Sequence, residues 1–200
     1  MQGPFWRVFP WDATATPGEP FTAEYRLPAG IQTGGRFDLP STSSLYLAIE
    51  EPIHALVEVL QIVRGKGYVS PSDLVKPTGD APRRFHPLAL VETWVADEVF
   101  AALPDLGDPA QLQRFGVRPD ELSSRNRTVT QRIAGKLHTE FGLPGFRWWS
   151  AFSGDWHVAV LFLDRVAAGQ IEFGTPDPLH LTHPVVAAAA AELKLQVTAR

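Results

Sequence analysis

Cysteine is absent from this sequence of 200 residues. Disulfide bonds, thiol nucleophiles and cysteine-ligated zinc sites are therefore excluded. The sequence also has no apolar run of about 18 residues, the length needed for a membrane-spanning helix. Residues 1–6 have neither the basic region nor the apolar stretch of a signal peptide. We therefore expect a cytoplasmic protein with no membrane partner.

Positive charge is also scarce. Lysine and arginine number 18 against 22 acidic residues, so the formal net charge is −4. Nucleic-acid-binding domains usually carry an excess of basic residues, so we expect no direct binding to nucleic acid. A local cluster of Arg125, Arg127, Arg132 and Lys136 fits a solvated helix face. The length suits one domain with a sizeable core.

A glycine-rich segment, Gly34-Gly35-Arg36-Phe37-Asp38, predicts a flexible turn. Paired glycines accept positive φ and let backbone N–H groups converge on an anion. The guanidinium of Arg36 can bind a phosphate through two parallel hydrogen bonds. The alternative is an ion pair between Arg36 and Asp38 or a loop carboxylate, and the residues alone favour neither interpretation.

A strand and a helix follow this turn. Residues 44–49 predict a strand, in which Tyr46 by itself fits a core tyrosine with a bonded hydroxyl. Pro52 suits the first position of a helix, and its apolar face is formed by Ile53, Leu56, Val57, Leu60 and Val63. His54, Glu58 and Gln61 fall on a narrow polar stripe of that helix. From the helix alone, a solvated surface glutamate is the favoured interpretation of Glu58.

The rest of the chain predicts alternating strands and helices. Strands are expected at 5–9, 23–27, 68–69, 146–150 and 158–163, and a strand that runs into a helix at 88–103. Helices are expected at 109–115, 127–141 and 184–197, and a glycine cap at residues 65–67 ends the Glu58 helix. This alternation predicts an α+β protein with a single compact domain over residues 1–200.

Four motifs together resemble the RES domain. They are the Gly-Gly-Arg-aromatic turn, Tyr46-Leu47-Ala48, the Pro-x-His-Ala-x-x-Glu motif of residues 52–58 in the predicted helix, and Phe146-Arg147-Trp148-Trp149-Ser150-Ala151. Trp6-Arg7-Val8 is also similar to the usual start of the family. The resemblance covers residues 5–64 and 123–163 in order. The family often has asparagine where this chain has Asp38.

The resemblance implies a fold and an activity. It implies an ADP-ribosyltransferase-like fold, with two small sheets around a cleft and surrounding helices, and residues 65–122 as a variable insertion. It also implies an NAD+-degrading enzyme that cleaves the nicotinamide–ribose bond by phosphorolysis or hydrolysis. Such a protein is typically the toxin of a toxin–antitoxin pair, and its partner is a helix-turn-helix antitoxin. NAD+ is then a substrate, inorganic phosphate a co-substrate in phosphorolysis, and no cofactor is expected.

The resemblance also implies roles for five residues. Glu58 would stabilise positive charge on the ribose, and Arg36 would bind the pyrophosphate or an incoming phosphate. Tyr46 would stack on the nicotinamide or ribose, and Ser150 would donate or accept a hydrogen bond near the reacting centre. Arg7 would be a second anion ligand. Without the resemblance, Ser150 at a strand end reads as a turn former.

Two other function classes remain open from the sequence. One is an ADP-ribosyltransferase that modifies a macromolecule with the same arginine, tyrosine and glutamate. The other is a non-catalytic module that binds a nucleotide or a protein. We expect no metal site, because neither Asp177, His180 and His183 nor the pair of His54 and Glu58 has a recognised ligand spacing.

Overall fold

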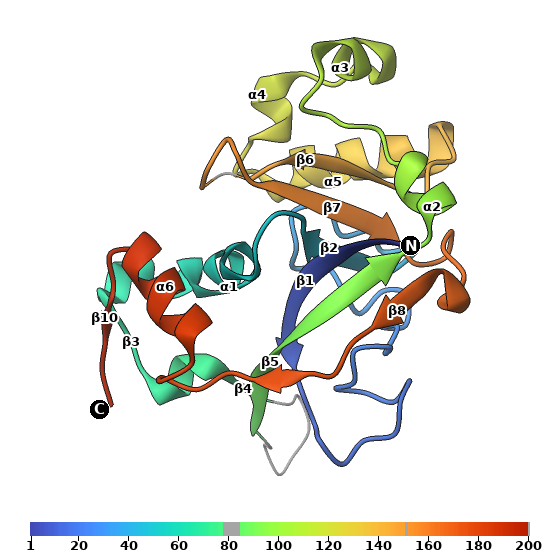
Figure 1. Ribbon diagram of the computed structural model, residues 1–200. Coiled ribbons are helices and arrows are strands. Elements are labelled where there is room, and N and C mark those ends of the chain that lie inside the picture. Colours follow the sequence, from blue (N-terminus) through green and yellow to red (C-terminus); the bar gives the residue numbers. More distant parts are fainter. Residues whose placement is uncertain (78–84, 151, 200) are drawn as a thin grey trace. The chain divides into compact units, whose positions relative to one another are not determined.

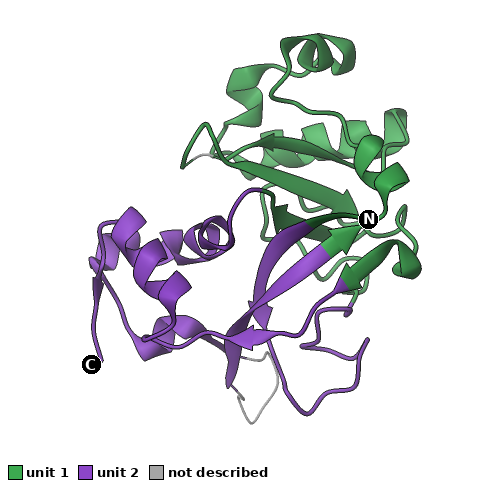
Figure 2. Ribbon diagram, viewed as in Figure 1, with its two compact units in different colours: residues 1–3, 26–49, 94–172 green, residues 4–25, 50–93, 173–200 purple. Residues whose placement is uncertain are grey.

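The computed structural model describes residues 1–77, 85–150 and 152–199. It contains both helices and strands, most of the strand pairs being antiparallel (Figure 1). The chain divides into two compact units that are interleaved along the sequence (Figure 2). The first unit consists of residues 1–3, 26–49 and 94–172, and the second of residues 4–25, 50–93 and 173–200.

Three antiparallel strands of the first unit pair in the order β2-β7-β6, as part of an eight-stranded sheet. These strands are β2 (Ser44–Ala48), β7 (His157–Phe162) and β6 (Gly145–Trp149). Tyr46 pairs with Val160, which pairs with Phe146. Directly opposed residues share a face of a sheet, so these three side chains lie on one face.

Helix α5 (Arg127–Gly135) supplies the other half of this core. It continues as a single π-helical turn over Lys136–Glu140. Ile133 and Leu137 are buried in one cluster with Phe146, Trp148 and Phe37. The four-residue apolar repeat of the sequence therefore marks the face of the helix that packs on the sheet, and the predicted helix at 127–141 is confirmed.

Three short helices of the first unit precede α5. They are α2 (Asp97–Ala101), α3 (Pro109–Phe115) and α4 (Pro119–Leu122). Proline occupies the first turn of α3 and α4, where the missing N–H leaves no helical bond unmade. The side chain of Asp108 caps α3 by accepting the N–H of Ala110 at 2.9 Å. Leu112, Phe115 and Leu122 of α3 and α4 join the same core cluster.

The second unit contains most of β1 (Gln2–Pro10) and β5 (Phe85–Val95), which are neighbours. Two short strands, β4 (Val75–Pro77) and β9 (Asp177–Pro178), pair antiparallel with β5. A third short strand, β8 (Ile171–Phe173), also pairs with β5, and its first two residues belong to the first unit. Phe9, Ala23, Ala89 and Val91 form a small buried cluster in this unit.

Two helices of the second unit pack against each other, α1 (Pro52–Leu60) and α6 (Pro184–Glu192) (Figure 1). A 3₁₀ helix, Gln61–Lys66, extends α1 and ends at Gly67, whose φ of 77° fits glycine at a helix C-terminus. The predicted glycine cap is thus confirmed. Beyond it, β3 (Tyr68–Val69) and β10 (Gln196–Val197) pair in parallel. Two more 3₁₀ helices, Pro71–Leu74 and Ala168–Gln170, complete the elements.

Two local predictions are wrong. The strand expected at 23–27 does not form, because the chain turns there and the N–H of Tyr25 bonds to the carbonyl of Thr22. The terminal helix ends at Glu192 instead of 197. Lys194 has a positive φ of 56°, and the N–H of Gln196 then bonds to the carbonyl of Gly67. Pairing with β3 therefore ends the helix early.

The mixed α and β class is confirmed. The other strands and helices expected from the sequence form within three residues of their predicted limits, and β1 and β5 each begin three residues early. No pattern in the sequence indicated β4, β8, β9, β10 or α4. The single domain over 1–200, the insertion at 65–122 and the two sheets around a cleft stay predictions.

No helix in the described ranges is both long and apolar enough to cross a membrane.

A buried histidine of the first unit lies against the carboxylate of Asp164. His138 Nε2 is 2.8 Å from Asp164 Oδ2. Burial raises the pKa of this carboxyl, but hydrogen bonds from Thr42 and His138 outweigh burial and leave the pKa below its usual value. Such a group stabilises the fold above its unfolded-state pKa, about 3.9, and this stabilisation is lost as the pH falls through the folded-state pKa.

We therefore expect Asp164→Asn to lower the free energy of unfolding at neutral pH by less than about 1 kcal/mol. The effect is small because the Asp164 side chain is 42% exposed and solvent screens the interaction. The difference from the wild type should disappear in strong acid, once the carboxyl is protonated in both states. Thermal melts over a pH series measure this, with the exposed Asp155→Asn as control. A difference that is independent of pH would contradict the role of the charge.

Candidate functional site

The glycine turn of the first unit is organised around the buried side chain of Asp38, which is 2% exposed. Its carboxylate accepts three hydrogen bonds. The Tyr46 hydroxyl donates one at 2.7 Å, the Gln32 side-chain amide donates one at 3.1 Å, and the backbone N–H of Gly35 donates a short one. These bonds replace the hydrogen bonds to water that the carboxylate loses through burial.

The two glycines of the turn differ in role from the prediction. Neither Gly34 nor Gly35 has a positive φ, so the turn does not use the left-handed conformation that glycine permits. A Cβ atom built on Gly35 would lie 2.5 Å from Asp38 Oδ1 and 2.7 Å from the Tyr46 hydroxyl oxygen. Gly35 is therefore needed because two side chains approach its backbone closely. A Cβ atom on Gly34 would meet nothing within 4 Å.

Helix α5 holds the same turn from its other side. The side-chain amide of Gln131 donates to the carbonyls of Thr33 at 3.2 Å and Gly35 at 3.0 Å. The Thr130 hydroxyl donates a short hydrogen bond to the carbonyl of Arg36. Three carbonyl groups of the turn are thus tied to a helix that is itself fixed in the core.

Arg36 itself lies over an aromatic ring. Its guanidinium carbon is 4.5 Å from the centre of the Trp148 ring, which is within the range of a cation–π contact. Its Nη2 donates to the carbonyls of Leu122 at 2.6 Å and Ser124 at 3.2 Å. These carbonyls belong to the C-terminal end of α4 and the residues after it, where a cation is favourable. Arg36 therefore has a structural function in addition to any ligand contact.

The hydroxyl of Tyr46 both donates and accepts a hydrogen bond within the protein. It donates to Asp38 and accepts from the N–H of Phe37 at 3.0 Å. Burial, followed by the nearby charge of Asp38, raises the pKa of Tyr46 well above its usual value, so the hydroxyl stays protonated. These contacts match the core tyrosine that its surroundings in the sequence favoured. Stacking of the ring on a ligand stays a prediction.

Ser150 follows directly after β6 and is 2% exposed. Its N–H donates to the carbonyl of Trp156 at 2.6 Å, and its hydroxyl oxygen accepts the N–H of Phe152 at 3.1 Å. Ser150 thus forms the turn that connects β6 to β7, as expected for a serine at a strand end. Its side chain lies two residues beyond Trp148, the residue that contacts Arg36, on the same face of the strand.

Glu58 lies on α1 of the second unit, and its side chain is 32% exposed. His54, one helical turn earlier, is completely buried, and its Nε2 lies 3.3 Å from Glu58 Oε1. The side chain of Gln61 reaches the other carboxylate oxygen at 3.4 Å. Glu58 is therefore a half-buried carboxylate at the margin of the helix, as its place on the polar stripe indicated, and side chains of two neighbouring turns lie against it.

Arg7 lies on β1 in the second unit. Its Nη1 donates to the carbonyl of Ala23 at 2.8 Å, and its guanidinium carbon is 5.1 Å from the centre of the Phe9 ring. Burial lowers the pKa of Arg7 to about 10, although the charge of Glu24 opposes this shift. The side chain stays protonated at neutral pH, as an anion ligand must be.

The five predicted residues belong to different units. Arg36, Tyr46 and Ser150 are in the first unit, and Arg7 and Glu58 are in the second (Figure 2). Within the first unit, the N–H of Phe37, which follows Arg36, bonds to the Tyr46 hydroxyl, and Arg36 lies over Trp148 of the strand that precedes Ser150.

The candidate metal ligands near the C-terminus have a structural role. His183 is the residue that precedes α6, and its Nδ1 accepts the N–H of Val185 at 3.2 Å. Its Nε2 lies 3.0 Å from Asp177 Oδ2. The imidazole therefore caps the helix, and Asp177 fixes its tautomer. Among the described residues, no group of three or more histidine or acidic side chains could hold a metal ion.

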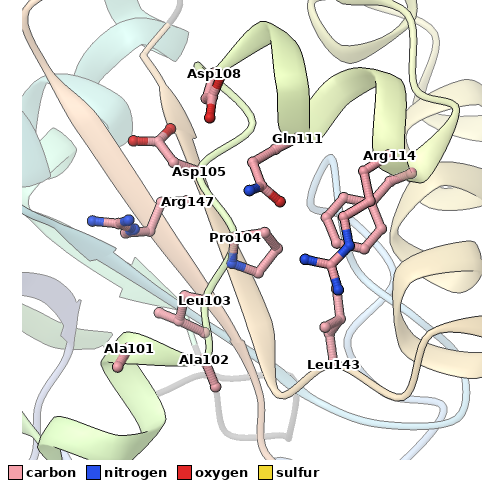
Figure 3. A pocket seen from close by; sticks show the side chains of 11 residues that line it. Ala101, Ala102, Leu103, Pro104, Asp105, Asp108, Gln111, Arg114, Leu143 and Arg147 are labelled. Atoms are coloured by element: carbon pink, nitrogen blue, oxygen red, sulfur yellow. The ribbon is translucent and has the colours of Figure 1, made fainter.

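A cavity of about 440 Å³ lies in the first unit, beside α3 and the edge of β6 (Figure 3). None of the five predicted site residues lines it. Its charged side chains are Asp105, Asp108, Arg114 and Arg147. Two carboxylates and two guanidinium groups cancel each other, so this cavity has no net preference for the anionic phosphates of a nucleotide.

Comparisons with known proteins identify the family. The model of the RES domain matches residues 4–182. The chain belongs to the RES domain family. Among solved structures it is similar to a chain of the M. tuberculosis MbcT–MbcA toxin–antitoxin complex, with 15% sequence identity and a TM-score of 0.55. The alignment covers 96% of this chain and 87% of that chain. No curated protein matches the sequence significantly.

The match confirms the family that the four motifs indicated. It also includes residues 65–122, where the motifs of this RES domain are weakest. Sequence reasoning missed Thr130 and Gln131, although both hold the turn of Arg36. Their signal was present only as polar residues of a predicted helix, which does not reveal their partners.

We expect Gly35→Ala to destabilise this RES domain by about 1–3 kcal/mol, the usual cost of overpacking a filled site. The added methyl group would have to displace Asp38 or Tyr46, both of which are held by other bonds. Gly34→Ala is the matched control, since open space surrounds that position. Chemical denaturation of both variants measures the effect, and equal stabilities would refute the packing argument.

Proposed function

We propose that this RES domain cleaves the nicotinamide–ribose bond of NAD+ and that Arg36 binds a phosphate of the substrate or co-substrate. The observation that carries the proposal is the fixed presentation of Arg36. Its backbone is bonded to α5, its side chain lies over Trp148, and the residues around it match the family motif. A guanidinium that is oriented before binding loses little conformational freedom when an anion arrives.

Cleavage of the nicotinamide–ribose bond requires one negative charge beside the ribose. Nicotinamide leaves as a neutral group, so no general acid is needed, and the ribose passes through a state that resembles an oxocarbenium ion. An oriented carboxylate stabilises this developing positive charge. In the proposal Glu58 has this role, and His54 keeps the carboxylate in one orientation through the contact at 3.3 Å.

Arg36 must change a contact to bind an anion through two parallel bonds. Either two-donor edge of a guanidinium includes Nη2, and Nη2 donates to Leu122 and Ser124 in this structure. The bond to Ser124 is the longer of the two, at 3.2 Å, and is the one that we expect to open. In the proposal, Tyr46 presents its ring to the nicotinamide or ribose, Ser150 a hydrogen bond, and Arg7 a second positive charge.

The proposal extends to a toxin with a protein partner. The similar M. tuberculosis chain comes from a complex that is described as toxin and antitoxin. We propose that this chain likewise acts as a toxin whose activity an antitoxin of the helix-turn-helix class blocks. The remaining expectations, an ADP-ribosyltransferase-like fold with a cleft and a cytoplasmic location, belong to the same proposal.

We expect the purified protein to consume NAD+ and release nicotinamide, because the family motif and the oriented Arg36 both point to this substrate. Chromatography of the nucleotides, with and without inorganic phosphate, measures the reaction. Faster loss with phosphate and a phosphorylated ADP-ribose product would identify phosphorolysis. Transfer of labelled ADP-ribose to a macromolecule would identify a transferase instead. NAD+ that survives under both conditions would refute the enzymatic proposal.

We expect Glu58→Gln to reduce turnover on the order of 10²–10³-fold, the scale for loss of one electrostatic stabiliser. Glutamine keeps the shape and can still accept from His54, so folding and NAD+ affinity should change little. Expression of the wild type should arrest bacterial growth, and the variant should not. Glu192→Gln, at the end of α6, removes one exposed charge from the neighbouring helix and serves as control. A folded Glu58→Gln protein with wild-type turnover would remove Glu58 from the mechanism.

A further inference from the structure

Every partner of the Asp38 carboxylate is a hydrogen-bond donor with a fixed direction. The Tyr46 hydroxyl oxygen accepts from the N–H of Phe37, so its proton is left for Asp38. The Gln32 side-chain oxygen accepts from the N–H of Ser44 at 2.9 Å, so its amino group must face Asp38 and the Ser44 carbonyl. The third donor, the N–H of Gly35, is part of the backbone.

Such surroundings require a group that accepts and does not donate. An ionised carboxylate has this property, whereas an asparagine amide would place its own amino group against one of the three donors. An asparagine at this position would therefore leave a conflict in this chain. Since position 38 is 2% exposed, water cannot relieve such a conflict.

The carboxylate lies directly against the segment that carries Arg36. It accepts the N–H of Gly35, the residue before Arg36. It is also linked to Phe37, the residue after Arg36, because the Tyr46 hydroxyl that donates to Asp38 accepts the N–H of Phe37. From the opposite side, Gln131 and Thr130 bind the carbonyls of Gly35 and Arg36. The backbone of Arg36 is thus held between a buried charge and a core helix.

We propose that Asp38 is a positioning residue for Arg36, which fixes the turn through its three accepted hydrogen bonds and so orients the guanidinium before any ligand binds. Asp38 does not touch the ligand in this proposal. The assignment rests on the proposed function only in the sense that Arg36 is taken as the anion ligand. The orientation of Arg36 can be measured without any substrate.

The first test uses nuclear magnetic resonance of the ligand-free protein. The Nε–H signal of Arg36, identified by its loss in Arg36→Lys, should have a high order parameter in the wild type and a clearly lower one in Asp38→Asn. Tyr46→Phe removes one of the three donors with little change in shape, and it should lower the order parameter in the same direction. This second variant decides the matter if Asp38→Asn does not fold. An unchanged Arg36 signal in a folded variant would overturn the proposal, whether or not the protein degrades NAD+.

The second test is a double-mutant cycle on the reaction. Asp38→Asn should raise the KM for NAD+ roughly 10- to 100-fold, the scale of a misplaced binding group. In the Arg36→Lys background the same change should alter KM less than about 2-fold, because the group that it orients is gone. Asp108→Asn, which alters a carboxylate that caps α3, is the matched control and should leave KM unchanged.

Equal effects of Asp38→Asn in both backgrounds would mean that Asp38 acts only on stability and would overturn the proposal. A wild type without NAD+ turnover would refute the proposed function, and the order parameter would then decide the role of Asp38.

Discussion

The carboxylate of Asp38 is the interaction on which the candidate site of the first unit depends. A buried charge is costly unless hydrogen bonds replace the lost water, and here three donors do so. Because those donors come from Gln32, Gly35 and Tyr46, one charge links the loop before the turn, the turn itself and strand β2. Removal of any member would leave a buried polar group unsatisfied, so the arrangement is cooperative.

Arg36 illustrates how one side chain can serve both stability and binding. Its contacts with Leu122 and Ser124 stabilise the end of α4, and its contact with Trp148 attaches it to the core sheet. A residue with these contacts would be retained for folding alone. Its proposed role in anion binding requires that one carbonyl contact is exchanged for a stronger, charge-assisted bond to a phosphate. The structural role therefore does not exclude the functional one, but it means that loss of activity in an arginine variant is informative only beside its stability.

Glu58 shows a similar combination on the second unit. A glutamate on the polar stripe of a helix is usually solvated, yet the completely buried His54 beneath it gives this carboxylate a fixed partner. A buried histidine with no role would be a poor choice in a helix core, where leucine packs better. Its contact with Glu58 gives a reason for a polar residue at that position. The same helix thus provides both the apolar face that packs on α6 and an oriented charge at its margin.

The sequence by itself determined the local structure and the family. Apolar spacing located α1 and α5, proline and glycine marked the helix limits, and four short motifs indicated the RES domain that the family match confirmed. These features depend on residues close together in the chain, where periodicity and turn chemistry act directly. Most of the failures occurred where distant segments meet. The pairing of β10 with β3 shortened the last helix, the cavity beside α3 gave no signal, and the partners of Asp38 and Gln131 could not be inferred. Only the tertiary structure decided them, because a side chain's hydrogen-bond partners depend on which elements pack beside it, and packing brings together residues that no local pattern connects.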